Sequence, residues 1–223
     1  MTKEALRIMN ILKQVCEKVA RFRSDENGSA SIELLLCVPL MVYAMLSTMV
    51  YFHAFRNEAI SERAGLTIAD LYSRESGDGS GINDEYIDNS RNLLRQLAFV
   101  DDDPDLRITF FEFSDADDAY QVVWSENRGY GSDYTDNDLL QLRNNLPIMA
   151  DGERSILVQT RIDYVSPVSV SIAPWIVSPL EDVVFNTYTV IRPRYTNTLC
   201  WHPSDGSDPI CGGDETEGEG GGV

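Results

Sequence analysis

The longest apolar run of the chain lies near its start, and it predicts a membrane-spanning helix. Between Glu33 and Arg56 there are 22 residues without a charged side chain, if His53 is counted as neutral. A helix rises about 1.5 Å per residue, so a run of this length matches the roughly 30 Å hydrocarbon core of a bilayer. We therefore expect residues 29–55 to form a transmembrane helix, with a kink at Pro39, which cannot donate a backbone hydrogen bond.

The helical period continues beyond the apolar run. Apolar side chains recur on one helix face, and charged residues occupy the other positions; the apolar members are Ile60, Ala64, Ile68, Leu71 and Tyr72. This pattern predicts one helix from about Ile32 to Arg74, with its end marked by the Gly/Ser-rich stretch 76–81. Residues 1–23 predict a short amphipathic helix, because their apolar side chains approximate one stripe. This segment does not resemble a secretory signal peptide, whose apolar core is continuous, because charges interrupt it throughout.

The rest of the chain mixes helical and strand periods. Helices are predicted over 84–98 and 136–145, and strands over 106–113, 120–125, 155–165 and 183–192. The apolar stretch 167–180 is interrupted by two prolines, so an irregular surface or a short helix is expected there. The order of elements predicts an α+β fold in which a small antiparallel sheet packs on the second half of the long helix.

Charge is distributed unevenly, and the distribution predicts an orientation. The chain has a net charge of −18, yet residues 1–27 carry six basic and four acidic side chains, including all the lysines. Because basic flanks remain in the cytoplasm, we expect the N-terminus there and the acidic part from Arg56 onward in the periplasm, outside the inner membrane. A surface this acidic repels phosphates, which argues against binding to nucleic acid.

Two acidic runs, 101–105 and 115–118, are rich in oxygen ligands. Neither has the residue spacing of a calcium-binding loop. A solvated surface is the simpler interpretation of this acidity, and calcium binding is the alternative.

Two of the four cysteines predict a disulfide. Cys200 and Cys211 flank a polar loop in the exported part, where oxidising conditions favour a bond between them. Only His202 lies near them, which argues against a metal site. The other two, Cys16 and Cys37, need no function.

Catalytic motifs are nearly absent from the sequence. The two histidines lie at the membrane border and between two cysteines, and no nucleophile elbow, zinc-binding helix motif or phosphate-binding loop occurs. Acidic pairs such as Glu112 with Asp115 arise by chance in so acidic a chain. We expect no enzymatic activity and no cofactor; a membrane-tethered hydrolase is the enzymatic alternative.

One short motif joins the start of the apolar run to the polar residues before it. Gly28 ends a charged stretch, and Glu33 is the fifth residue after it. If the chain is cut after Gly28, the new α-amine of Ser29 lies one helical turn from the Glu33 carboxylate and can compensate it. This spacing resembles the class III leader of type IV pilin-like proteins. The string GSASIELLLCVPLMV, with Pro39, is similar to the N-terminal motif of TadE-like minor pseudopilins of tight-adherence (Flp) pili.

The later part of the chain extends the resemblance loosely. The run ILVQTRIDYVSP, followed by an apolar segment and then by TVIRPRY, also looks like the end of TadE-like domains. The resemblance implies a pilin-like fold and cleavage between Gly28 and Ser29 by a prepilin peptidase. It also implies roles in assembly and processing for Glu33 and Pro39. The partners it implies are other pilins and the assembly platform proteins of a Tad pilus or related secretion system.

The expected organisation therefore has four parts. Residues 1–28 are a cytoplasmic leader that is cleaved, 29–55 the transmembrane helix, 56–199 a periplasmic α+β domain, and 200–223 a disulfide loop with a disordered acidic tail. The mature protein would lie in the inner membrane or in the pilus. The alternative function is that of an uncleaved single-pass protein whose acidic domain binds a periplasmic partner or calcium.

Overall fold

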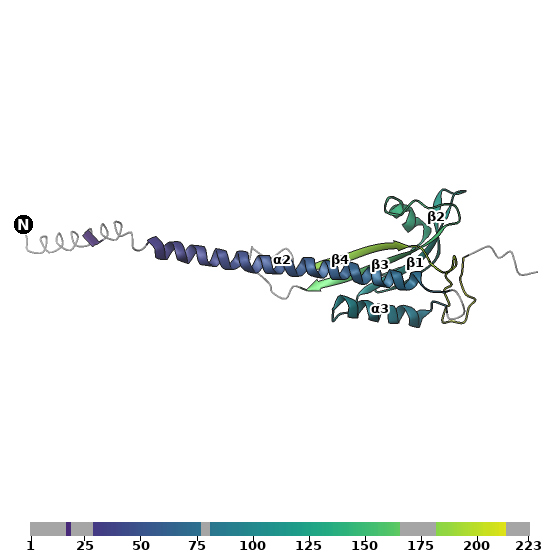
Figure 1. The fold of residues 1–223 in the computed structure, drawn as a ribbon, viewed down its shortest axis with the longest axis horizontal. Coiled ribbons are helices and arrows are strands. Elements are labelled where there is room, and N and C mark those ends of the chain that lie inside the picture. Colours follow the sequence, from purple (N-terminus) through teal and green to yellow (C-terminus); the bar gives the residue numbers. More distant parts are fainter. Residues whose placement is uncertain (1–16, 19–28, 77–80, 166–181, 213–223) are drawn as a thin grey trace, which may run out of the picture. The chain divides into compact units, whose positions relative to one another are not determined.

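The computed structural model describes residues 17–18, 29–76, 81–165 and 182–212. Its elements in chain order are α2 (Ser29–Ser73), α3 (Asp84–Ala98), β1 (Asp105–Ser114), β2 (Ala119–Arg128), α4 (Asp136–Leu142), the short 3-10 helix η2 (Arg143–Asn145), β3 (Arg154–Val165) and β4 (Asp182–Ile191) (Figure 1). The chain divides into two units at Val50 and Tyr51 of α2. The leader, the stretch 167–180 and the acidic tail after Gly212 lie outside the described residues, apart from 17–18.

The four strands form one antiparallel sheet in the order β2-β1-β3-β4. At its centre Phe110 of β1 pairs with Trp124 of β2 and with Ile156 of β3. The prediction of an α+β fold with a small antiparallel sheet is therefore confirmed. The strand order joins β1 to β3 across the intervening α4, a pairing that the sequence pattern did not specify.

One face of the sheet packs on the second half of α2 and on α3, as the helical period predicted. Ile68 and Tyr72 of α2 belong to the same buried core as Ile108 and Phe110 of β1, and Figure 1 shows α2 and α3 beside the sheet. Gly65 lets α2 approach closely, since a Cβ atom there would lie 2.8 Å from the Thr187 hydroxyl of β4. The helix and the inner face of the sheet thus form a single core.

The opposite face of the sheet carries a second, smaller core under α4. Phe111 and Leu157 of the sheet pack there with Leu139 of α4. At the N-terminus of α4, the Thr135 backbone N–H and hydroxyl both donate to the Asp138 carboxylate, over 2.8 Å and 2.7 Å. The two-sided burial explains why β1 is buried along most of its length.

A buried arginine lies beside this second core. Arg107 is 7% exposed, and its guanidinium carbon lies 4.2 Å and 4.0 Å from the ring centroids of Tyr130 and Tyr134. Its Nη1 donates to Gln159 Oε1 over 3.1 Å. Two aromatic faces replace part of the hydration that a buried cation loses. The sequence pattern gave no indication of this cluster, because residues 129–135 have the composition of a turn.

The predicted element boundaries agree closely with the structure, with one informative exception. α3 has the predicted bounds, and the Asn83 side chain caps it by accepting a hydrogen bond from the Tyr86 N–H over 2.8 Å. β2 was expected to end at Ser125 but extends to Arg128. Its last three residues are polar, so they lack strand periodicity, yet Arg128 pairs with Leu106 of β1. Backbone pairing extended this edge strand beyond its apolar pattern.

Candidate functional site

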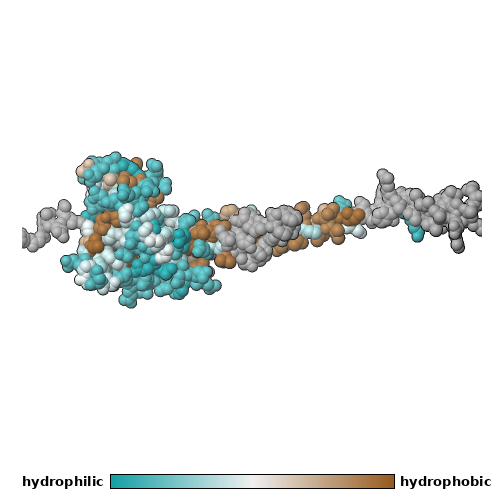
Figure 2. Space-filling view, turned by 180° about the vertical axis from the view of Figure 1, so that it is seen from behind, coloured by the Kyte–Doolittle hydropathy of each residue, from teal (hydrophilic) through white to brown (hydrophobic). Residues whose placement is uncertain are grey.

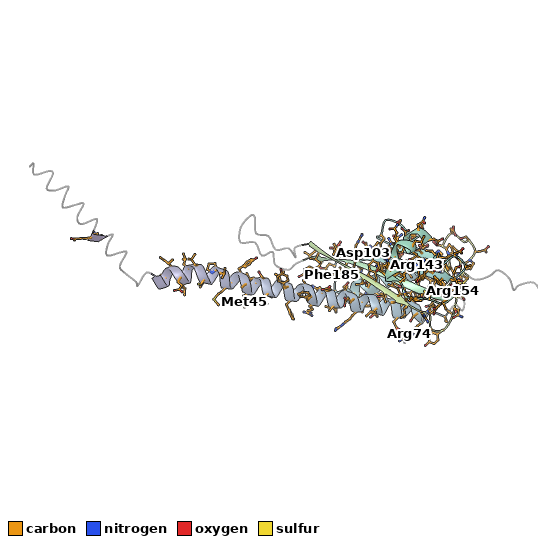
Figure 3. All side chains as sticks on the ribbon, turned by 90° about the horizontal axis from the view of Figure 1, so that it is seen from above. Met45, Arg74, Asp103, Arg143, Arg154 and Phe185 are labelled. Atoms are coloured by element: carbon orange, nitrogen blue, oxygen red, sulfur yellow. A yellow bond between two sulfur atoms is a disulfide. The ribbon has the colours of Figure 1, made fainter. Side chains whose placement is uncertain are left out.

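The first half of α2 exposes an apolar surface that water would not favour. By length and composition, α2 is the one helix among the described residues that could cross a membrane. Met45 is 77% exposed, and Figure 3 shows its side chain pointing away from the helix. The other large exposed apolar residues up to Val50 are Ile32, Leu34, Leu35, Leu36, Val38, Leu40, Met41, Val42, Leu46 and Met49. In Figure 2 this part of the helix is mainly brown, whereas the visible face of the domain is mainly teal. An apolar surface of this extent marks a site that lipid or protein covers.

The residues predicted for processing and assembly lie at the start of this segment. Ser29 is the first residue of α2, and Glu33 follows it by one helical turn. Glu33 is exposed and has no hydrogen bond or ion pair with any described residue. Gly28 lies outside the described residues. Pro39 lies inside α2, whose helical conformation continues through it, and the kink there stays a prediction.

The two predicted disulfide cysteines lie in what we call the C-terminal clasp, residues 199–212. Cys200 and Cys211 are bonded to each other. Inside the loop they close, Trp201 and Ile210 exchange backbone hydrogen bonds of 2.8 Å and 2.9 Å. On its other side the clasp bonds the backbone two residues before α3: the Ile82 N–H donates to the Cys200 carbonyl, and the Ile82 carbonyl accepts from the His202 N–H.

Aromatic packing joins the clasp to the main core. Trp201 is buried and stacks on Trp124 of β2, with ring centroids 6.0 Å apart and an interplanar angle of 30°. The Trp124 indole N–H donates to the Leu199 carbonyl over 2.7 Å. The clasp is therefore part of the core of the domain. Sequence reasoning missed this contact, and Trp201 directly after a disulfide cysteine was the available signal.

A polar cluster fastens the clasp on its solvent side. The Ser204 hydroxyl donates to Asp84 at the start of α3, and Arg128 bonds both Asp84 and Asp88 over 2.6 Å. The pKa of Asp84 is lowered, chiefly by the Ser204 hydrogen bond; burial opposes this, and Arg128 lowers the pKa further. One network of charged and polar side chains thus joins the C-terminal end of β2, the start of α3 and the clasp.

Replacing both cysteines of the clasp by serine should destabilise the domain. The disulfide restricts the unfolded chain, and for a loop of this size the loss is ~3 kcal/mol of unfolding free energy. Urea denaturation of the full chain in detergent measures it. The matched control is Cys37→Ser, which removes a free, exposed cysteine and should leave the urea midpoint unchanged. Equal midpoints for the double serine variant and the control would show that the disulfide contributes nothing.

The acidic runs are partly paired with arginines. Asp103 accepts from Arg95 over 2.9 Å and lies 3.7 Å from Arg91, and Asp118 forms an ion pair with Arg143. Over the described ranges, no group of three or more His, Cys, Asp or Glu side chains is placed to hold a metal ion. The geometry of these residues therefore gives no positive support to the calcium alternative.

The predicted site residues thus belong to two different units of the chain. Glu33 and Pro39 lie in the unit that ends at Val50, and the two clasp cysteines lie in the α+β domain. Within the domain, the hydrogen bonds and ion pairs described above join residues of the fold to one another. Comparison with known proteins adds no assignment: no family model, no curated protein and no solved structure matches the chain.

Proposed function

We propose that the protein is a membrane-anchored structural subunit, a TadE-like minor pseudopilin of a tight-adherence pilus or a related secretion system. One observation carries the proposal: α2 is a single helix whose first half exposes apolar side chains and whose second half belongs to the core of an α+β domain. No turn or linker separates the membrane segment from the core helix. This continuity supports a subunit that assembles through packed membrane helices.

In this proposal the N-terminus is cytoplasmic and the domain is periplasmic. The uneven charge of the chain supports that orientation, because all the lysines precede the apolar segment. A prepilin peptidase in the inner membrane cuts between Gly28 and Ser29. In the described part of the chain α2 begins at Ser29, the residue that would become the new N-terminus. Gly28, before the bond, has no side chain to obstruct the approach of a protease.

Cutting at Gly28 should be blocked by a side chain at that position. Gly28→Val places a branched side chain next to the bond, so we expect only the uncut form when the variant is expressed with the peptidase. Immunoblotting with an antibody to the domain distinguishes the two lengths. Gly131→Val in the loop after β2 is the control, since a Cβ atom there would meet nothing within 4 Å and the variant should be processed normally. Normal processing of Gly28→Val would show that the cut does not lie between Gly28 and Ser29.

Glu33 gives the proposed assembly step a physical basis. A carboxylate inside an apolar helix is costly unless it finds a cation, and Glu33 has none among the described residues. After cleavage the α-amine of Ser29, its own or that of a neighbouring subunit, supplies one. An uncut subunit would bring an unpaired carboxylate into the helix packing. In this proposal, therefore, a subunit can assemble only after it has been cleaved.

Glu33→Gln should separate processing from assembly. It keeps the size of the side chain and removes its charge, so we expect normal insertion and cutting but severalfold less protein in the pilus complex. Co-purification with the major pilin or the platform proteins measures this. Glu58→Gln, an exposed position in the second half of α2, is the matched control. If Glu33→Gln co-purifies as well as that control, Glu33 merely reaches the water interface and has no role in assembly.

The alternative is an uncleaved single-pass protein that binds a periplasmic partner through its acidic domain. The excess of carboxylates on the domain is the observation in its favour. Leader processing distinguishes the two functions, because the alternative retains residues 1–28 in the mature protein.

A further inference from the structure

Phe99, which ends α3, carries a large apolar side chain where the fold does not require one. Its φ and ψ angles of 55° and 42° are left-handed, a conformation that glycine and sometimes asparagine adopt at the end of a helix. The conformation caps the helix, because the Phe99 N–H donates to the Gln96 carbonyl over 3.3 Å. The ring contributes little to this cap, since the residue is 85% exposed. An exposed ring on a strained backbone therefore indicates a role outside the fold.

A second exposed apolar residue lies at the same end of the domain. Val165, the last residue of β3, is 72% exposed. Phe99 and Val165 line one pocket, together with Asn57 and Ser61 of α2. Phe185, labelled in Figure 3, lines it as well. Residues that line one pocket lie close together, so the two exposed side chains, Phe99 and Val165, share one surface, which we call the proximal end.

The position of the proximal end along α2 indicates what covers it. Asn57 and Ser61 follow Phe55, the last residue of the predicted membrane segment, by two and six positions. At about 1.5 Å per residue they lie about 3 Å and about 9 Å beyond that segment along the helix. The headgroup layer extends roughly 5–8 Å beyond the hydrocarbon core. When α2 spans a bilayer, the proximal end is therefore level with the lipid headgroups.

We propose that the proximal end docks on the bilayer that α2 spans, with the Phe99 ring and the Val165 side chain inserted among the lipid headgroups. The inference rests on the membrane anchor of the proposed function, to which it adds a second membrane contact. Apolar side chains that leave water for the boundary between headgroups and acyl chains gain free energy. Because α2 already holds the domain beside the membrane, a few side chains are enough to orient it.

The charge beside these side chains selects the class of lipid. Asp101 and Asp102 line the same pocket as Phe99, and both are exposed. In the part of the chain that the structure describes, the ion pairs of this end involve Asp103 and Asp105 instead. Carboxylates repel an anionic headgroup such as that of phosphatidylglycerol and attract the ammonium of a zwitterionic one such as that of phosphatidylethanolamine. The surface that fits is therefore zwitterionic.

Spin labels measure whether the proximal end lies in the lipid. The full chain, with Cys16 and Cys37 replaced by serine, is reconstituted in nanodiscs of phosphatidylethanolamine and phosphatidylcholine. A nitroxide is attached to one introduced cysteine, Met45→Cys, Val165→Cys or Tyr195→Cys. Oxygen reaches labels in lipid, and a water-soluble nickel chelate reaches labels in water. The first two labels should favour oxygen, with Val165→Cys the shallower, and the third should favour nickel.

Tyr195 is the control for distance from the membrane, and it is 72% exposed. The N–H of Arg194, the residue before it, donates to the Ser73 carbonyl over 2.8 Å. Ser73 lies about 27 Å beyond Phe55 along α2, so a label at Tyr195 stays in water.

The labels distinguish failure of docking from failure of the membrane anchor. A Val165→Cys label in water, with the Met45→Cys label in lipid, would overturn docking and leave the anchor intact. A Val165→Cys label that neither reagent reaches would show that protein covers the proximal end, and would also overturn docking. A Met45→Cys label in water would overturn the anchor and docking together.

Phe99→Asn separates the role of the ring from that of the backbone conformation. Asparagine adopts left-handed conformations more readily than phenylalanine, so the urea midpoint in detergent should equal or exceed that of the wild type. Loss of the ring should lower the ratio of docked to undocked Val165→Cys label roughly tenfold or more, the scale expected for one large apolar side chain. Phe99→Leu should restore most of that loss.

A matched variant and a change of lipid complete the test. Ile148→Asn removes an apolar side chain that is 96% exposed in the loop between η2 and β3, and it should dock as the wild type does. Exchanging part of the lipid for phosphatidylglycerol should weaken docking at low salt, and NaCl should reverse part of this effect. Unchanged docking of Phe99→Asn, or an equal loss in Ile148→Asn, would contradict the proposal. Stronger docking on phosphatidylglycerol would contradict the zwitterionic surface.

Discussion

The double variant Leu40→Arg/Met45→Arg, which places two arginines in the apolar half of α2, should be lost from the membrane fraction. On insertion scales each arginine near the middle of a bilayer costs about 2.5–3.5 kcal/mol, so the pair costs about 5–7 kcal/mol. Both side chains are exposed and belong to neither core of the α+β domain. The domain should therefore still fold. Carbonate extraction followed by immunoblotting measures the distribution between membrane and soluble fractions.

The control for this experiment places the same charge on the same helix but outside the predicted membrane segment. Leu66→Arg changes an exposed residue in the second half of α2 and should leave the protein in the membrane fraction. If the double arginine variant resists carbonate extraction as the wild type does, the apolar half of α2 is not a membrane anchor. Its exposed surface would then have to be covered by protein.

Trp124→Ala should be among the most destabilising single substitutions in the domain. It leaves a cavity where a buried tryptophan stood, for which losses of roughly 3–5 kcal/mol are typical. It also removes the stacking on Trp201 and the hydrogen bond to the Leu199 carbonyl. The clasp would then be held to the domain by its polar cluster and by its backbone hydrogen bonds to Ile82. Urea denaturation followed by tryptophan fluorescence and circular dichroism measures the change.

Two comparisons separate packing from hydrogen bonding at this position. Trp124→Phe retains an aromatic ring but loses the indole donor, and we expect a smaller loss, of which the hydrogen bond is about 1 kcal/mol. Tyr195→Ala removes an exposed aromatic side chain and should have little effect. Trp124→Ala within 1 kcal/mol of wild type would contradict the assignment of the clasp to the core.

The elements with a long, regular period were predictable from the sequence, and their long-range contacts were not. The 3.6-residue pattern from Ile60 to Tyr72 predicted the second half of α2, and α3 has the bounds that its apolar pattern predicted. The pairing of β1 with β3 depends on which strands meet across α4, and no local pattern encodes that. Small antiparallel sheets allow several strand orders with the same local sequence.

The residues of the candidate sites also divide into those that the sequence pattern predicts and those that only the fold brings together. The apolar segment, Glu33 and the two cysteines stand out in the sequence by composition and spacing. The stacking of Trp201 on Trp124 and the enclosure of Arg107 by two tyrosines do not, because they join residues far apart in the chain. Tertiary contacts supply the chemistry in each case.

The mass of the mature N-terminal peptide tests the proposed function most directly. The wild-type chain is expressed with a prepilin peptidase, purified from membranes with the domain intact, and digested for mass spectrometry. The proposal predicts a peptide that begins at Ser29, with Glu33 as its fifth residue, and loss of residues 1–28. A peptide that begins at Met1 in membrane-bound protein, with the peptidase active on a known substrate in the same cells, would contradict it.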